Sequence, residues 1–180
     1  IKLQDFTFGS DFTPHPILVE KTKLTFNTKN VSLEETTVKT GESDIRLKGT
    51  LDNLYGYVFS NRTLKGSLDV KSNLFKVSDF YEADTTSVLK EEGSVTKEHQ
   101  DDGEQIKIPA NIYALANVEA KSVVYDNMEL SSFKGKAIIE DQKITFSNAN
   151  ANVFKGSVAL NGYVDTKPNK TAYNFDLKLK

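Results

Sequence analysis

The sequence predicts an all-β protein with a minor helical component, a long antiparallel meander that forms a curved, groove-like or taco-like sheet. Two observations lead to this fold class. β-Branched and aromatic residues dominate the patterned segments, and such residues favour strands. These segments place an apolar residue at every second position between short polar turns, as in a sheet with one sheltered face and one wet face. The hydrophobic fraction of 38% is low for a globular chain and agrees with one wet face.

The first half of the chain holds several short alternating segments. A loop is expected at residues 11–16, where prolines remove backbone donors and disfavour a central strand. The aromatic residues 55–59 are expected to form a strand or a bent connection. Leu74 and Val77 lie at helical spacing, so a short helix is expected within residues 74–80. The expected strands are 1–8, 23–28, 31–33, 36–40, 45–54 and 64–70.

The charged segment at residues 81–105 differs from the rest of the chain. It mixes charges of both signs, has little apolar content and shows no sustained period. We expect a mobile linker that joins two similar halves of one sheet system, about 1–80 and 106–180. The whole chain, 1–180, is expected to be a single β-rich module excised from a larger protein.

The second half carries the clearest strand pattern. Residues 112–124 alternate without a break, which is long compared with a typical strand of about 5–6 residues. A bulge within residues 147–152 would move Ala149, Ala151 and Val153 onto the apolar face. The other expected strands are 128–139, 144–146, 156–164 and 173–179, with polar turns between them.

Three segments share the order apolar residue, lysine, glycine, hydroxyl residue, apolar residue. They lie at residues 47–51, 64–68 and 154–158. A glycine inside a strand often marks a bend or a close approach of another backbone. The recurrence predicts a sheet that curls and favours a modular β architecture.

The apolar face of the expected sheet is the candidate functional site. The larger apolar residues of the second half are the candidate lining of a groove: Ile112, Val118, Val124, Ile144, Phe146, Val158, Leu160 and Val164. Such a face forms either the floor of a groove open to apolar ligands or half of a closed core. Long strands, glycine-marked bends and little helix to cover a sheet favour the groove.

The residue types exclude several kinds of chemistry. Without cysteine, the chain has no disulfide, thiol nucleophile or cysteine-bound zinc. His15 and His99 stand apart in the sequence, and no GxSxG elbow accompanies them. The acidic run at 101–104 lacks the alternating spacing of a calcium loop, so a solvated charge run is expected. We therefore expect no enzyme, no cofactor and no metal site.

Charge and hydropathy also bear on the kind of partner. The formal net charge is -2 and the basic residues are dispersed, so no nucleic-acid partner is expected. No apolar run approaches the roughly 20 residues that span a bilayer.

Five segments resemble the C-terminal region of AsmA family proteins. They are Ile108-Pro109-Ala110-Asn111 before the long strand, and residues 123–130, 133–136, 154–158 and 162–166. The family shows a comparable entry with isoleucine or valine before proline, a strand that ends in tyrosine before a polar turn, and glycine-containing strands. With a similar earlier piece at 66–74, the resemblance spans about residues 45–176.

The resemblance implies a non-enzymatic periplasmic module of a protein anchored in the bacterial inner membrane. AsmA-like proteins, related to TamB and to bridge-like lipid transfer proteins, form taco-like β-grooves and are linked to outer-membrane biogenesis and phospholipid transport. The expected partner is a phospholipid or another acyl-chain ligand, and the family offers no catalytic residue to carry over. The alternative is a structural or adhesive β-repeat domain of a secreted or surface protein.

Overall fold

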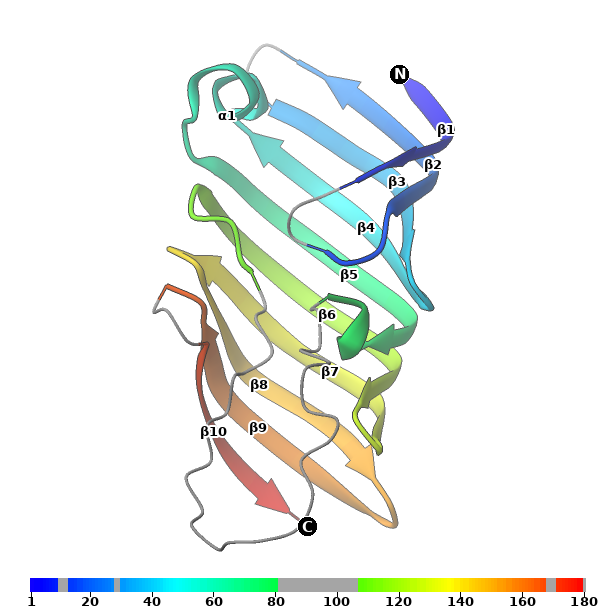
Figure 1. Ribbon diagram of the computed structural model, residues 1–180, viewed down its shortest axis with the longest axis vertical. Coiled ribbons are helices and arrows are strands. Elements are labelled where there is room, and N and C mark those ends of the chain that lie inside the picture. Colours follow the sequence, from blue (N-terminus) through cyan, green and yellow to red (C-terminus); the bar gives the residue numbers. More distant parts are fainter. Residues whose placement is uncertain (10–12, 28–29, 81–106, 168–170, 180) are drawn as a thin grey trace, which may run out of the picture.

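The computed structural model describes residues 1–9, 13–27, 30–80, 107–167 and 171–179. These residues form one ten-stranded sheet, whose strands lie side by side in the order of the sequence (Figure 1). The sheet is curved and is not closed into a barrel. The predicted all-β meander with a minor helical component is therefore confirmed.

Within the described residues, the strands are long and helix is confined to two short elements. The strands are β1 (Lys2–Phe8), β2 (Ile17–Phe26), β3 (Asn30–Thr40), β4 (Ser43–Asp52), β5 (Leu64–Lys76), β6 (Ile112–Tyr125), β7 (Met128–Glu140), β8 (Lys143–Val153), β9 (Gly156–Asp165) and β10 (Ala172–Leu179). The helix α1 (Leu54–Ser60) follows β4, and the 3-10 helix η1 (Val77–Phe80) follows β5.

One pairing departs from an antiparallel meander, because β5 and β6 run parallel. β5 therefore ends at the opposite end of the sheet from the start of β6. Alternation within a strand does not encode its direction, so the sequence pattern did not indicate this pairing. The predicted linker at 81–105 lies outside the described residues.

The cross-strand register places the alternating apolar residues on one side of the sheet, the apolar face. In the centre, Val118 of β6 lies opposite Val70 of β5 and Gly135 of β7. Directly opposed residues point to the same side of a sheet. The alignment continues to both edges, reaching Phe6 on β1 and Leu177 on β10. A single apolar face thus runs across all ten strands.

The predicted bulge in β8 keeps the alternation on this face. The register of β8 against β9 slips after Phe146. Asn148 at the slip has a left-handed φ of 51°, and its N–H donates to Oδ1 of Asn161 at 2.9 Å. Ala149 and Ala151 consequently lie on the apolar face, where they are 2% and 4% exposed.

The aromatic segment after β4 forms the helix α1, so the expectation of a strand or bent connection there is wrong. Asn53 and Asn61 flank the helix with left-handed φ values of 64° and 49°. Nδ2 of Asn53 donates to the carbonyl of Thr63 at 2.9 Å, and the N–H of Arg62 donates to the carbonyl of Gly56 at 3.0 Å. Two left-handed asparagines close this compact loop, which the β propensity of its tyrosine, valine and phenylalanine does not reveal.

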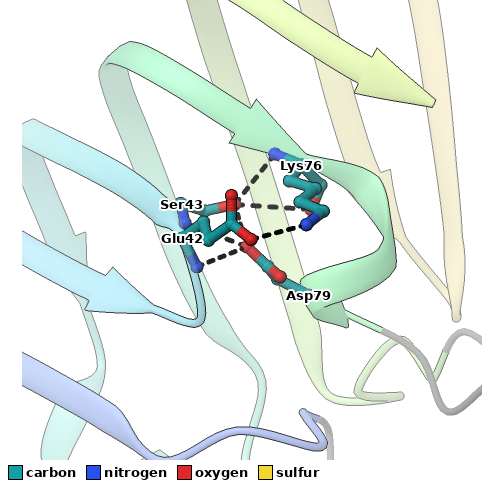
Figure 2. Close-up of polar contacts among 4 residues, drawn as sticks. All are labelled: Glu42, Ser43, Lys76 and Asp79. Carbon is teal, nitrogen blue, oxygen red and sulfur yellow. Dashed lines mark hydrogen bonds and ion pairs between the residues drawn. The ribbon is translucent and has the colours of Figure 1, made fainter. Parts of the chain in front are cut away.

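The short helix expected within residues 74–80 is confined to a 3-10 turn at Val77–Phe80, because β5 continues to Lys76. Asp79 in this turn is 4% exposed, and its Oδ2 accepts three hydrogen bonds (Figure 2). The N–H groups of Glu42 and Ser43 donate at 2.9 Å each, and the hydroxyl of Ser43 donates at 2.7 Å. The β3–β4 turn is thereby fastened to the end of β5.

Side chains of β4 also replace part of its backbone ladder with β5. Oδ1 of Asp44 accepts from the N–H of Asn73 at 2.9 Å and from the N–H of Leu74 at 2.8 Å. Oγ of Ser43 accepts from the N–H of Lys76 at 2.9 Å. These backbone donors therefore stay paired beyond the last aligned residues of the two strands.

The three lysine-glycine segments do not occupy equivalent places. Gly49 and Gly66 lie within the neighbouring strands β4 and β5, whereas Phe154 and Lys155 form the β8–β9 turn. A close backbone approach is confirmed at Gly49, because a Cβ built there would overlap the carbonyl oxygen of Ser67. At Gly66 the nearest neighbours of such a Cβ are side-chain atoms. The sheet therefore needs glycine at the first position and only tolerates it at the second.

Two buried serines on the apolar face offer a matched stability test. Ser72 is 5% exposed, and its hydroxyl has no hydrogen-bond partner within the described part of the chain. An unpaired buried hydroxyl costs about 1–3 kcal/mol, so Ser72→Ala is expected to raise the free energy of unfolding by about 1 kcal/mol. Ser43→Ala, which removes three partners, is expected to lower it by about 2 kcal/mol. Urea denaturation followed by circular dichroism measures both, and a less stable Ser72→Ala protein would contradict the unpaired assignment.

Candidate functional site

The structure brings all eight predicted lining residues together on the apolar face. Their elements are β6 for Ile112, Val118 and Val124, β8 for Ile144 and Phe146, and β9 for Val158, Leu160 and Val164. Val158 is buried at 6% exposure, and the other seven are half-buried. The set therefore forms one continuous patch over the second half of the sheet.

Buried alanines make up the centre of this face, and the candidate list did not include them. They are Ala114, Ala116 and Ala120 of β6, Ala137 of β7, and Ala149 and Ala151 of β8, each between 2% and 9% exposed. The alternation in the sequence indicated these positions too, but the candidate lining was limited to the larger apolar side chains. Because alanine projects little from the sheet, the neighbouring valines and phenylalanine extend further than this central floor.

The first half of the sheet contributes to the same face. Val19, Val31 and Leu33 are buried there at 6% to 9% exposure. Two buried hydroxyls of this half bond to each other, since Oγ1 of Thr22 lies 2.6 Å from Oγ1 of Thr36. The candidate lining was restricted to the second half, whereas the apolar face extends well beyond it.

The C-terminal strand forms a wall beside the floor. The ring of Phe175 on β10 lies 6.4 Å from the ring of Phe146 on β8, across the intervening strand β9. This approach needs glycine at position 162, because a Cβ built on Gly162 would overlap Phe175 and the backbone of Asn174. Further along β10, Leu177 remains 57% exposed. The wall is therefore apolar and open to solvent.

Among the described elements, none packs as a second layer on this face. Within the described ranges, extensive contacts join neighbouring strands, and a few contacts join α1 to β5 and η1 to β6. The charged residues aligned on this face within the described ranges are Lys76 and Glu129, both at strand ends. The floor is thus apolar over most of its area, as the groove hypothesis requires.

The opposite face carries the charges. Ion pairs between neighbouring strands include Lys21–Glu35 at 2.7 Å, Lys39–Glu20 at 2.5 Å, Lys71–Glu119 at 3.6 Å and Lys143–Asp165 at 3.0 Å. The hydrogen bond from Lys143 holds the pKa of Asp165 below its ordinary value, with help from the N–H of Lys167, and the same bond raises the pKa of Lys143. Exposed ion pairs of this kind contribute little to stability, but they identify the solvent-exposed face of the sheet.

At the end of the strands beside α1, a cleft of about 570 Å³ adjoins the apolar face. Its lining combines Phe26 and Val31 of the apolar face with Tyr55 and Phe59 of α1, and Arg62 lies at the same cleft. The cleft makes the surface of α1 continuous with the apolar face.

Metal-binding groups are not assembled in the part of the chain that the structure describes. No cluster of three or more His, Asp or Glu side chains suited to a metal ion occurs there. His15 is exposed, and its carbonyl accepts from the hydroxyl of Thr13 at 2.9 Å. His99 and the acidic run at 101–104 lie outside the described residues. Within the described ranges, no helix has the length and apolar character to cross a membrane.

Comparisons with known proteins identify no relative of the chain, so the proposal on its function depends mainly on the geometry of the apolar face. Neither a family model, nor a curated protein, nor a solved structure matches the chain. The resemblance to AsmA proteins stays a prediction from the residues quoted above.

Proposed function

We propose that the chain is a non-enzymatic lipid-binding module whose apolar face shelters the acyl chains of a phospholipid during transport. The observation that carries the proposal is the continuity of this face across ten strands, with no described layer packed on it. Each buried CH₂ group of an acyl chain contributes about 0.8 kcal/mol. The charged headgroup would remain in water at the rim of the sheet.

The exposure of the apolar face supports a ligand of this kind. Monomeric proteins rarely leave contiguous apolar patches larger than a few hundred Å² in water. Large side chains at both edges stay exposed, among them Phe8 at 44%, Tyr173 at 66% and Leu179 at 75%. Acyl chains are flexible and apolar along their length, so they fit a shallow floor without requiring polar groups at fixed positions.

The cellular setting is proposed from the resemblance to AsmA proteins. In that setting the module lies in the periplasm, its parent protein is anchored in the bacterial inner membrane, and it takes part in outer-membrane biogenesis. The curved meander supports this setting, since the family is expected to form taco-like β-grooves.

A structural or adhesive β-repeat domain is the second candidate. It is supported by the edge strands β1 and β10, each of which has one neighbour in the described sheet. Unpaired strand edges can pair with further strands, which suits a stacked repeat. The two candidates differ in whether phospholipid occupies the apolar face.

Two substitutions on the same strand test the proposal. Val118→Asp places a carboxylate in the centre of the apolar face, whereas Leu115→Asp places one on the opposite face, where Leu115 is 42% exposed. An unpaired charge in an apolar site is costly, so we expect Val118→Asp to lower bound phospholipid about tenfold or more. The control is expected to retain it. Mass spectrometry of lipids extracted from the purified proteins measures the molar ratio.

Circular dichroism is required to show that both variants keep the strand content of the parent. A parent protein that carries no phospholipid after purification from a bacterial host, and takes up none from vesicles, would refute the lipid-binding function. Equal lipid content in the two folded variants would remove the apolar face as its site.

A further inference from the structure

The connection between β4 and β5 is longer than a hairpin needs. β4 ends at Asp52 and β5 begins at Leu64, so the connection spans residues 53–63, whereas β6 and β7 are joined by Asp126 and Asn127 alone. The additional residues build α1 at the end of the sheet (Figure 1). This helix is therefore an addition to the meander, and the turn between β4 and β5 does not require it.

α1 presents apolar side chains to solvent. Tyr55 is 76% exposed, Val58 is 59% exposed and Phe59 is 71% exposed. The rings of Tyr55 and Phe59 lie 4.6 Å apart on one side of the helix. Their exposure is costly in water, because each ring would stabilise the protein if it were buried.

Hydrogen bonds hold α1 in this position. Oδ1 of Asn61 accepts from Nδ2 of Asn111 at 2.6 Å, and the N–H of Leu64 donates to the carbonyl of Asn111 at 3.0 Å. The N–H of Tyr57 donates to the carbonyl of Asn53 at 2.9 Å. The second end of the loop is thus bonded to Asn111, just before β6, and the first turn of the helix is closed onto Asn53, so the exposed rings belong to a hydrogen-bonded element.

The charge of the loop fits a phospholipid surface. Residues 53–63 contain no aspartate or glutamate, and their one charged residue is Arg62. Tyrosine and other aromatic side chains favour the boundary between headgroups and acyl chains, and arginine pairs with phosphate in a bidentate manner. The cleft that contains Arg62 also contains Phe26 and Val31 of the apolar face.

From these observations we propose that α1 inserts its aromatic side chains into the headgroup region of a phospholipid bilayer. The insertion brings the end of the apolar face against the membrane, so that an acyl chain can pass from the bilayer to the sheet through the cleft. This inference rests on the proposed lipid-binding function.

A tryptophan reporter tests the insertion directly, because the chain contains no tryptophan. Phe59→Trp places a reporter on α1, and Phe154→Trp places the control in the β8–β9 turn, where Phe154 is 96% exposed. With phosphatidylcholine vesicles containing phosphatidylglycerol, the Phe59→Trp protein is expected to show a blue-shifted emission that brominated lipids quench. The control is expected to keep the emission of a tryptophan in water.

Vesicle flotation of further variants separates the contribution of the aromatic rings to membrane binding from that of Arg62. The double variant Tyr55→Ser with Phe59→Ser is expected to bind vesicles about tenfold or more weakly, given the apolar area that it removes. Arg62→Gln is expected to reduce the preference for phosphatidylglycerol about fivefold, as one basic residue near an anionic surface does. Binding unchanged in the double variant would overturn the proposal.

Two further results would also overturn it. Identical responses of the two tryptophan reporters would show a non-specific association, and a blue shift of Phe59→Trp that grows with protein concentration in the absence of vesicles would assign the patch to a second copy of the chain. Neither result affects the proposed function, which depends on phospholipid carried by the purified protein. Conversely, vesicle binding through α1 by a protein that never carries phospholipid would refute the function alone.

Discussion

Replacing Gly49 by alanine is expected to lower the free energy of unfolding by about 3 kcal/mol or more, the largest loss anticipated for a single added methyl group in this chain. Gly49 has a φ of 146°, a backbone conformation that residues with a Cβ rarely adopt. The added Cβ would also overlap the carbonyl oxygen of Ser67 in β5. Because this neighbour is backbone, the clash is relieved only by moving one strand away from the other.

Gly66→Ala in the adjacent strand is the matched control. A Cβ there would lie 3.2 Å from the Cδ2 atom of Leu51, a side chain that can shift. Since alanine restricts the unfolded chain more than glycine does, we expect a change within about 1 kcal/mol of the parent. Urea midpoints followed by circular dichroism compare the two proteins. Equal midpoints would show that the β4–β5 approach at Gly49 has no energetic consequence.

The second large effect is expected from Asp79→Ala. The substitution removes the acceptor of three hydrogen bonds. Their donors, the N–H groups of Glu42 and Ser43 and the hydroxyl of Ser43, then lose this partner. Asp79 is 4% exposed, so water does not easily replace the carboxylate. We expect a loss of about 2–4 kcal/mol in the free energy of unfolding.

Glu42→Ala tests a neighbour in the same cluster at a much more exposed contact. Its carboxylate pairs with Nζ of Lys76 at 2.7 Å, and the two side chains are 66% and 35% exposed. Exposed ion pairs of this kind contribute about 0–1 kcal/mol, so the control is expected to unfold close to the parent midpoint. If both variants lost the same stability, the role assigned to the buried carboxylate would be wrong.

Gly49 and Asp79 both affect the shape of the sheet. Within the described residues, no second layer packs on this sheet. A sandwich holds its curvature by packing one sheet on another. Here most described contacts between elements join neighbouring strands. Local features such as Gly49, Gly162 and the hydrogen bonds of Asp79 therefore determine much of the shape of the apolar face.

Particular residues show how far the sequence predicted this face. The alternation from Ile112 to Val124 predicted the long central strand, and the change of parity after Phe146 predicted the bulge. The apolar character of the candidate residues placed all of them on one side of the sheet. The alternation and the bulge also placed alanines on this face, but the candidate lining did not include them, and the hydroxyl pair of Thr22 and Thr36 was not predicted. Small and polar side chains are buried only through their neighbours, so their burial has no signal of its own in the sequence.

Other features had no local signal. The helix α1 forms in a segment with strand propensity, because Asn53, Asn61 and Asn111 supply hydrogen bonds that a local pattern does not contain. The contact between Asp79 and the β3–β4 turn joins residues that are 36 positions apart in the chain. The parallel pairing of β5 with β6 depends on the path of a long connection, on which side-chain alternation is silent.

The amino-acid sequence by itself determined that this protein is a β-sheet with one apolar and one charged face, since the period of two acts within each strand. The tertiary structure decided that the strands form a single curved sheet in chain order, which elements stand at its ends, and which side chains make its floor and wall. The physical reason is that alternation sorts side chains between faces. Register, strand direction and close approach depend on contacts between residues that are distant in the chain.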